Sequence, residues 1–94
     1  DFNNTNIGSQ TADINLYPNP NSGSFTLAMQ HAQNGQLDIN IYDVVGKRIY
    51  AIEARKETAS FARNIQLPDT KQGVYFVEIS LNEQERYIKK VVIF

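Results

Sequence analysis

The feature that most constrains the fold is an alternation of apolar and polar residues, which recurs in short runs along most of the chain. Within these runs every second residue is apolar, as in a β-strand that turns one face to a core and the other to water. No window of helical length carries the apolar stripe of an amphipathic helix. The apolar positions of the regular runs are Phe25, Leu27, Met29, Leu37, Ile39, Ile41, Ile65, Leu67, Tyr75, Val77, Ile79 and Leu81. We predict that these side chains form the core.

Shorter or less regular strands are predicted at 14–17, 48–53 and 87–93. The end of the chain, IKKVVIF, has apolar residues on both faces, as a central or covered strand does. About seven short strands, spaced roughly 8–14 residues apart without a helix, indicate an all-β protein. The predicted fold is an immunoglobulin-like antiparallel β-sandwich of about seven strands.

Turn-forming residues separate the predicted strands. Residues 34–35 (Asn-Gly) have the sequence of a tight hairpin turn, because both residue types tolerate positive φ. Residues 43–46 (Asp-Val-Val-Gly) fit a type I turn with Gly46 in the left-handed conformation. Residues 68–69 (Pro-Asp) begin another turn, and 82–84 close the last hairpin.

The stretch LYPNPNSGSFTL at 16–27 combines a stiff turn with the start of a strand. Pro18 and Pro20 have a restricted φ and disfavour helical geometry in the residue before each of them. We therefore expect 17–20 to be a stiff, extended segment with few backbone donors, which fits only at a sheet edge. Gly23 is free to adopt positive φ, so the chain can turn there into the next strand.

Composition excludes several functional classes. The chain has 94 residues, enough for one domain with a modest core. Its formal net charge of −1 argues against a nucleic-acid partner, which requires a basic patch. No apolar run approaches the ~18 residues of a membrane helix, and no signal peptide opens the sequence. We interpret the chain as a mature piece of a longer protein.

The polar segment 1–13, DFNNTNIGSQTAD, consists mostly of residues that cannot form a buried face. We expect it to be a flexible linker, followed by a folded domain at 14–94.

The sequence offers no pattern for catalysis or for metal binding. Cysteine is absent and His31 is the only histidine, so neither a thiolate site nor a paired-imidazole site can be assembled. His31 follows a predicted strand, and we expect it at a solvated loop edge. The serines lack a nucleophile motif and the carboxylates are scattered. We expect no enzyme activity, no cofactor and no small-molecule substrate.

The charged run ERYIKK at 85–90 allows two interpretations. Its lysines can form a solvated strand edge, where their charge prevents mispairing with another chain. Alternatively, Lys89 and Lys90 help to present the C-terminal strand to a receptor.

Five blocks occur in a distinctive order: LYPNPNSGSFTL, LDINIYDVVGKRIY, IQL, QGVYFVEI and YIKKVVIF. In this order and spacing they closely resemble the C-terminal sorting domain, type A, of the type IX (Por) secretion system of Bacteroidetes. The resemblance covers residues 14–94. It implies an immunoglobulin-like sandwich without catalytic activity, which directs a cargo protein across the outer membrane.

The resemblance also implies where recognition takes place. The first motif would be Tyr17, Pro18, Asn19, Pro20 and Gly23, within the segment 17–23. The second motif would be Gly73, Val74 and Tyr75. The terminal motif would be Lys89, Lys90, Val91 and Val92, in a strand that continues to Ile93.

Partners and location follow from the same resemblance. The implied partners are an outer-membrane translocon, a shuttle protein and a sortase-like peptidase of the type IX machinery, together with an N-terminal cargo domain. The route would lead through the periplasm to the cell surface or the medium. The polar linker before Ile14 is where cleavage is expected.

Two other functions remain compatible with the sequence. One is an accessory immunoglobulin-like module of a secreted enzyme or adhesin that binds carbohydrate or protein, and the other is a structural spacer. A carbohydrate module usually exposes a row of aromatic side chains on one face. The candidates for such a row are Tyr42, Tyr50, Phe76 and Tyr87.

Overall fold

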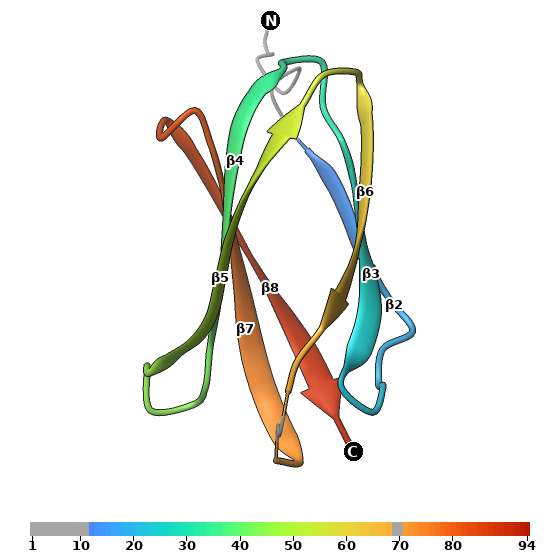
Figure 1. The fold of residues 1–94 in the computed structure, drawn as a ribbon, viewed down its shortest axis with the longest axis vertical. Coiled ribbons are helices and arrows are strands. Elements are labelled where there is room, and N and C mark those ends of the chain that lie inside the picture. The colour runs from blue at the N-terminus through green and yellow to red at the C-terminus, as the bar shows by residue number, and fades with distance from the viewer. Residues whose placement is uncertain (1–11, 69–70) are drawn as a thin grey trace, which may run out of the picture.

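The computed structural model describes residues 12–68 and 71–94, and this part of the chain contains strands and turns but no helix. Seven strands form two antiparallel sheets that face each other as a sandwich (Figure 1). The predicted all-β sandwich is therefore confirmed. The expected linker at 1–13 lies almost entirely outside the described residues, and the first strand begins at Asp13.

One sheet has three strands in the order β2-β3-β6. β2 (Asp13–Tyr17) pairs over its whole length with β3 (Ser24–Gln30). On its other side β3 pairs with β6 (Ser60–Gln66). The strand that begins right after the proline-rich stretch is thus the centre of this sheet, and β2 is one of its edges.

The other sheet has four strands in the order β5-β4-β7-β8. β4 (Gly35–Tyr42) pairs with β5 (Arg48–Lys56) on one side and with β7 (Gly73–Leu81) on the other. β7 in turn pairs with β8 (Glu85–Ile93). The last strand of the chain is therefore an edge strand, and the expectation of a central position for it is wrong.

The apolar residues on both faces of β8 have a different cause. Val91 and Ile93 point inward and are buried. Val92 points to the outer face of the sheet, where it lies opposite Val74 of β7. The second apolar face thus reflects an apolar neighbour on the outer surface and not a second covering layer.

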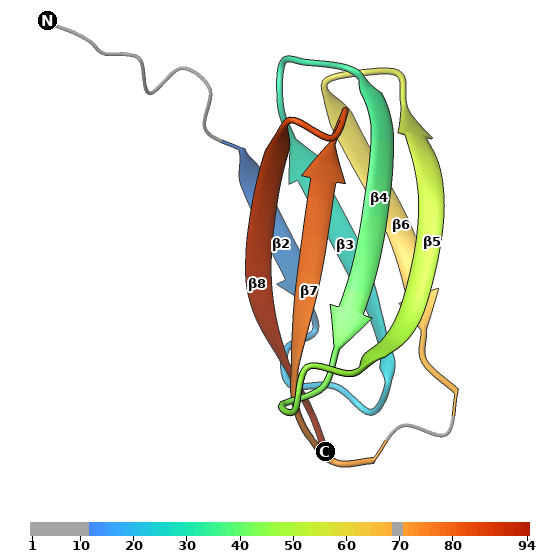
Figure 2. The same cartoon turned by 90° about the vertical axis from the view of Figure 1, so that its left-hand side faces the viewer.

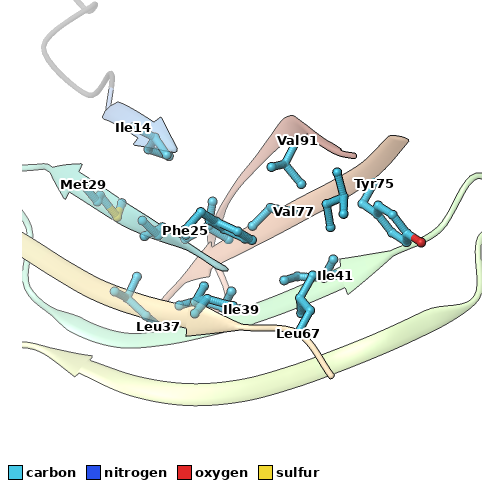
Figure 3. Packing of buried hydrophobic residues seen from close by; sticks show 14 of the residues in the cluster. Ile14, Phe25, Met29, Leu37, Ile39, Ile41, Leu67, Tyr75, Val77 and Val91 are labelled. Atoms are coloured by element: carbon cyan, nitrogen blue, oxygen red, sulfur yellow. The ribbon is translucent and has the colours of Figure 1, made fainter. Parts of the chain in front are cut away.

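The core lies between the two sheets and consists of the alternating residues (Figure 3). Each of the twelve positions predicted from the alternation is buried, and Ile14, Val91 and Ile93 complete the cluster. Burial of each large apolar side chain contributes about 1.5–3 kcal/mol. The period of two in the sequence therefore identified the inner face of every regular strand.

Two of the predicted turns are confirmed. Asp43 accepts hydrogen bonds at its carboxylate from the backbone N–H groups of Val45 and Lys47, at 3.1 and 2.9 Å, and Gly46 adopts φ +89°. This turn joins β4 and β5, as expected. The turn at 82–84 joins β7 and β8, with positive φ at its first two residues.

The predicted hairpin turn at 34–35 is wrong. Gly35 is the first residue of β4, and β3 and β4 belong to different sheets, so no hairpin joins them. The Asn82 side chain restricts which residue fits at position 35, because a Cβ on Gly35 would lie 1.9 Å from the Asn82 side-chain oxygen. That amide accepts a hydrogen bond from Gln36 N–H and donates one to the Asn34 carbonyl. The positive φ of Gly35, +147°, and this long-range contact both favour glycine there.

The sandwich has two ends with different loops (Figure 2). The N-terminal pole consists of the start of β2 and the connections at 31–34, 57–59 and 82–84. The C-terminal pole consists of 18–23, 43–47, 67–68, 71–72 and Phe94. Each pole is therefore assembled from segments far apart in the sequence.

Candidate recognition surface

The first predicted motif lies against the free edge of the last strand. The Asn19 side chain donates from Nδ2 to the Lys90 carbonyl oxygen at 3.1 Å and accepts at Oδ1 from Val92 N–H at 3.0 Å. A side-chain amide here makes the two hydrogen bonds that a neighbouring strand would make. The first and terminal motifs are thus in direct contact.

Asn21 continues this contact with its backbone. Its N–H donates to the Val92 carbonyl at 3.0 Å, and its carbonyl accepts from Phe94 N–H at 2.8 Å, which forms a short parallel bridge. The Asn21 side chain is buried and holds the turn itself, because it donates to the Pro18 carbonyl and accepts from Gly23 N–H. We call the contacts of Asn19 and Asn21 with β8 the asparagine clasp.

The backbone of the first motif differs from the expectation in one respect. Residues 18–20 form bends, and the peptide bonds before Pro18 and Pro20 are both cis, so the expected extended segment is wrong. The hydrogen bonds of the Asn21 side chain to Pro18 and Gly23 close these residues into a turn, which rules for the residue before proline do not include. The expected location at a sheet edge is confirmed, since the segment lies along β8.

The second motif pairs with the terminal motif. Gly73, Val74 and Tyr75 begin β7 and lie opposite Ile93, Val92 and Val91 of β8. The Tyr75 ring is buried in the core, and its hydroxyl donates to the Lys71 carbonyl at 2.6 Å. The structure therefore brings the three motifs together around the end of β8 nearest the C-terminal pole.

The two lysines of the terminal motif point in opposite directions. Lys89 lies opposite the buried Val77 and belongs to the inner face, whereas Lys90 lies opposite Phe76 on the outer face. Both side chains are exposed. A single flat partner on the outer face can therefore contact Lys90 but not Lys89.

Apolar side chains surround Lys90 on the outer face. Val74 and Val92 are half-buried cross-strand neighbours, and Phe76 is exposed. We call Val74, Phe76, Lys90 and Val92 the outer patch. It combines residues of two motifs, and its apolar side chains with one cation are of the kind that binds proteins.

The aromatic row of a carbohydrate module is not formed. Tyr42 and Phe76 are cross-strand neighbours on the outer face, but Tyr50 and Tyr87 pack against the core from the inner face. A hollow of about 690 Å³ on the outer face lies over charged residues such as Asp38, Glu53 and Arg86 and has no aromatic lining. This hollow therefore offers no aromatic ring on which a sugar could stack.

His31 at the N-terminal pole is buried, so its expected solvated position is wrong. Its Nδ1 accepts from Gln33 N–H at 2.9 Å, so Nε2 carries the proton and donates to the Glu85 carboxylate at 2.9 Å. The Tyr87 hydroxyl donates to the same carboxylate oxygen. Sequence patterns do not predict this contact, because His31 lies in the connection from β3 to β4 and both of its partners lie on the distant strand β8.

These contacts shift two pKa values. The hydrogen bond from Tyr87, and then that from His31, hold the pKa of Glu85 below its usual value, although burial opposes them. Burial and the neighbouring carboxylate raise the pKa of Tyr87 to about 12. The group therefore favours the ionised Glu85 and the protonated Tyr87.

Lys56 is also buried at the N-terminal pole. Its ammonium donates to the carbonyls of His31 and Gln33 at 2.6 and 2.7 Å and to Asn34 Oδ1 at 2.9 Å. Burial lowers the pKa of this ammonium. All three of its donors are used to hold the connection from β3 to β4, so Lys56 is a structural group.

Among residues 12–68 and 71–94, no three histidine, aspartate or glutamate side chains are grouped so that they can hold a metal ion. The same residues include no helix with the length and apolar character needed to cross a bilayer.

The comparison with protein families identifies the chain. Residues 15–94 match the family model of the secretion system C-terminal sorting domain, so the chain belongs to this family. It is a sorting domain of the type IX secretion system, a non-catalytic signal that engages this machinery and directs secretion across the outer membrane to the surface or medium.

Known proteins place the domain within larger chains. An endo-acting ulvan lyase of Formosa agariphila is 30% identical over 82 residues, which cover 87% of this chain and 15% of the lyase. The crystal structure of dimeric latent PorU from Porphyromonas gingivalis matches with a TM-score of 0.71 at 18% identity, over 88% of this chain and 9% of PorU. A β-glucosidase of Listeria innocua shares only the fold, with a TM-score of 0.50 at 10% identity over 88% of this chain and 16% of the enzyme.

Proposed function

We propose that the type IX machinery recognises this domain at the outer patch and the asparagine clasp. The observation that supports the proposal is the convergence of the three motifs on the free edge and outer face of β8. The clasp fixes the strand, and the strand places Val92 and Lys90 beside Val74 and Phe76. The clasp is thus the support, and the outer patch is the contact surface.

The proposed partners act in sequence. A cargo domain N-terminal to residue 1 reaches the periplasm, and the translocon and its shuttle protein then bind the folded sorting domain. A sortase-like peptidase separates cargo from sorting domain within 1–13, which lies largely outside the described residues. The N-terminal pole faces the cargo, because β2 begins there (Figure 2). The C-terminal pole and outer patch thus stay accessible.

The experiment compares the two lysines of the terminal motif. A periplasmic reporter is fused to residues 1–94 in a type IX-competent strain and in a strain without the translocon. Reporter is then measured in periplasm, on the surface and in the medium. Lys90→Gln removes the cation of the outer patch, and Lys89→Gln is the matched control on the inner face.

We expect wild type and Lys89→Gln to be exported and Lys90→Gln to accumulate in the periplasm. Neutralising either exposed lysine changes the free energy of unfolding by less than ~0.5 kcal/mol, so both variants keep their melting temperature. Export of Lys90→Gln at the wild-type level would contradict the proposal that the outer patch is the contact surface. Equal loss in both variants would show that the strand edge, and not one face, carries the signal.

A further inference from the structure

The tip of the β4–β5 hairpin exposes apolar surface that none of the three motifs includes. Val44 and Val45 are adjacent and are 70% and 83% exposed. The turn beneath them is fixed, since the Asp43 carboxylate binds two backbone N–H groups and Gly46 N–H donates to the Asp43 carbonyl. Two valines held rigidly in water at a loop tip are a feature of contact surfaces.

A cavity of about 360 Å³ lies beside this tip at the C-terminal pole. Its apolar lining comes from Ile49, Leu67, Pro68 and Tyr75. Leu67 and Tyr75 are core residues, and they lie at the same end of the core (Figure 3). The cavity is therefore a recess in the end of the sandwich with core residues in its wall, and its volume suits one large apolar side chain.

The rim of the cavity is cationic. Lys47 and Lys71 line it and are exposed, and within the described part of the chain no carboxylate pairs with either ammonium. Among the described residues of the lining Asp43 is the only acidic one, and its carboxylate is bound by Val45 and Lys47 N–H groups. The Tyr75 hydroxyl fixes the backbone of Lys71 to β7. Two exposed cations on a backbone that is held in place favour an anionic partner.

We propose that the valine tip and this cavity form a docking site for an acidic, extended segment of a partner protein. One apolar side chain of the segment enters the cavity, and carboxylates on either side of it face Lys47 and Lys71. The site is separate from the outer patch. The identification of the partner as a component of the secretion machinery rests on the proposed function.

Binding is tested with isotope-labelled 1–94 and a synthetic peptide, acetyl-Ser-Asp-Glu-Leu-Glu-Asp-Ser-amide. We expect amide shifts at 43–47 and 71–75. Replacing the leucine of the peptide by serine, or its acids by the corresponding amides, should each weaken binding by roughly fivefold or more. Shifts elsewhere, no binding, or equal binding of all three peptides would overturn the proposal.

Protein variants test the same site from the other side. Val44→Ser with Val45→Ser, and Lys47→Gln with Lys71→Gln, should each weaken the peptide by roughly fivefold or more. Ile88→Ser is the matched apolar control, since Ile88 is 63% exposed on β8, and Arg55→Gln is the charge control. Controls that weaken binding as much as the site variants would contradict the assignment.

The reporter fusion then connects the site to export. If wild type is not exported, the proposed function fails, whereas peptide binding still decides the docking site. If wild type and Ile88→Ser are exported, both double variants should accumulate in the periplasm with unchanged melting temperatures. Their export at the wild-type level would exclude the machinery as the partner.

Discussion

The two ends of β8 are held at the two poles of the sandwich by different kinds of chemistry. At the C-terminal pole, neutral asparagine amides hold the edge of β8. At the N-terminal pole, the charged groups of Lys56 and Glu85 hold the loops, together with His31 and Tyr87. The comparison separates polar groups that are bound within the fold from charged groups that remain exposed. The neutral amides do not pair with the lysines of the C-terminal pole, whereas the charges of Lys56 and Glu85 are bound within the fold.

Lys56→Met is expected to have the largest effect on this comparison. Methionine keeps the apolar stem but leaves two carbonyls and one amide oxygen without their donor, which costs about 2–4 kcal/mol of unfolding free energy. Chemical denaturation measures the loss. Arg55→Met, at an exposed neighbouring position, is the control and should change stability by less than ~0.5 kcal/mol. Equal effects would mean that the buried ammonium does not hold this pole.

Asn21→Ala comes next, because the Asn21 side chain is buried and makes two hydrogen bonds within the turn. Their loss should cost about 2 kcal/mol. Ser22→Ala, one residue on and exposed, is the matched control. Melting curves of the two variants measure the difference in stability. If Asn21→Ala melts like Ser22→Ala, the turn is held by its prolines alone.

Asn19→Asp is a sharper test of the neutral clasp. A carboxylate can still accept from Val92 N–H, but its other oxygen would oppose the Lys90 carbonyl, at a cost of about 1 kcal/mol at pH 7. Protonation of the aspartate restores the donor, so the gap to wild type should close below about pH 4. Melting temperatures from pH 7 to pH 3 show this. A gap that is independent of pH would contradict the assigned hydrogen bonds.

Glu85→Gln should have the smallest effect, about 0.5 kcal/mol at pH 7, because glutamine can still accept from Tyr87 and His31. The pKa of Glu85 is lower in the folded state, so the ionised carboxylate contributes stability above its unfolded pKa of about 4.3. This contribution is lost as the pH falls through the lowered folded value. The wild-type advantage should therefore shrink from pH 7 to pH 3. An advantage that grows on acidification would reverse the sign of the shift.

The sequence predicted the core because period-two alternation is a local signal that a folded sheet preserves. Lys56 carries the same signal, since it shares the inner face of β5 with Ile52 and Ala54. The predicted strand ended at residue 53, whereas β5 continues to Lys56, and parity alone would have placed Lys56 on the inner face. His31 has the same parity, since it follows Met29 by two residues, but its contact with Glu85 has no local signal because Glu85 lies 54 residues away.

The recognition surface was predictable only in part. The motifs were found through their resemblance to a family, but their mutual contacts depend on strand register, which short runs do not specify. The opposite facing of Lys89 and Lys90 follows from strand alternation and could have been predicted once 87–93 was assigned as a strand. The role of Asn21 could not, since a turn-rich sequence offers several polar side chains for the same hydrogen bonds.

The asparagine clasp joins residues 71 and 73 positions apart in sequence, and one of its contacts is made by Phe94 itself. During synthesis Asn19 and Asn21 therefore leave the ribosome long before their partners in β8 have been made. A chain that stops short of residue 90 contains the whole first motif but cannot assemble the surface that the motif supports. On the proposed function, residues from both ends of the domain form the recognition surface, so a chain truncated before residue 90 should not be exported.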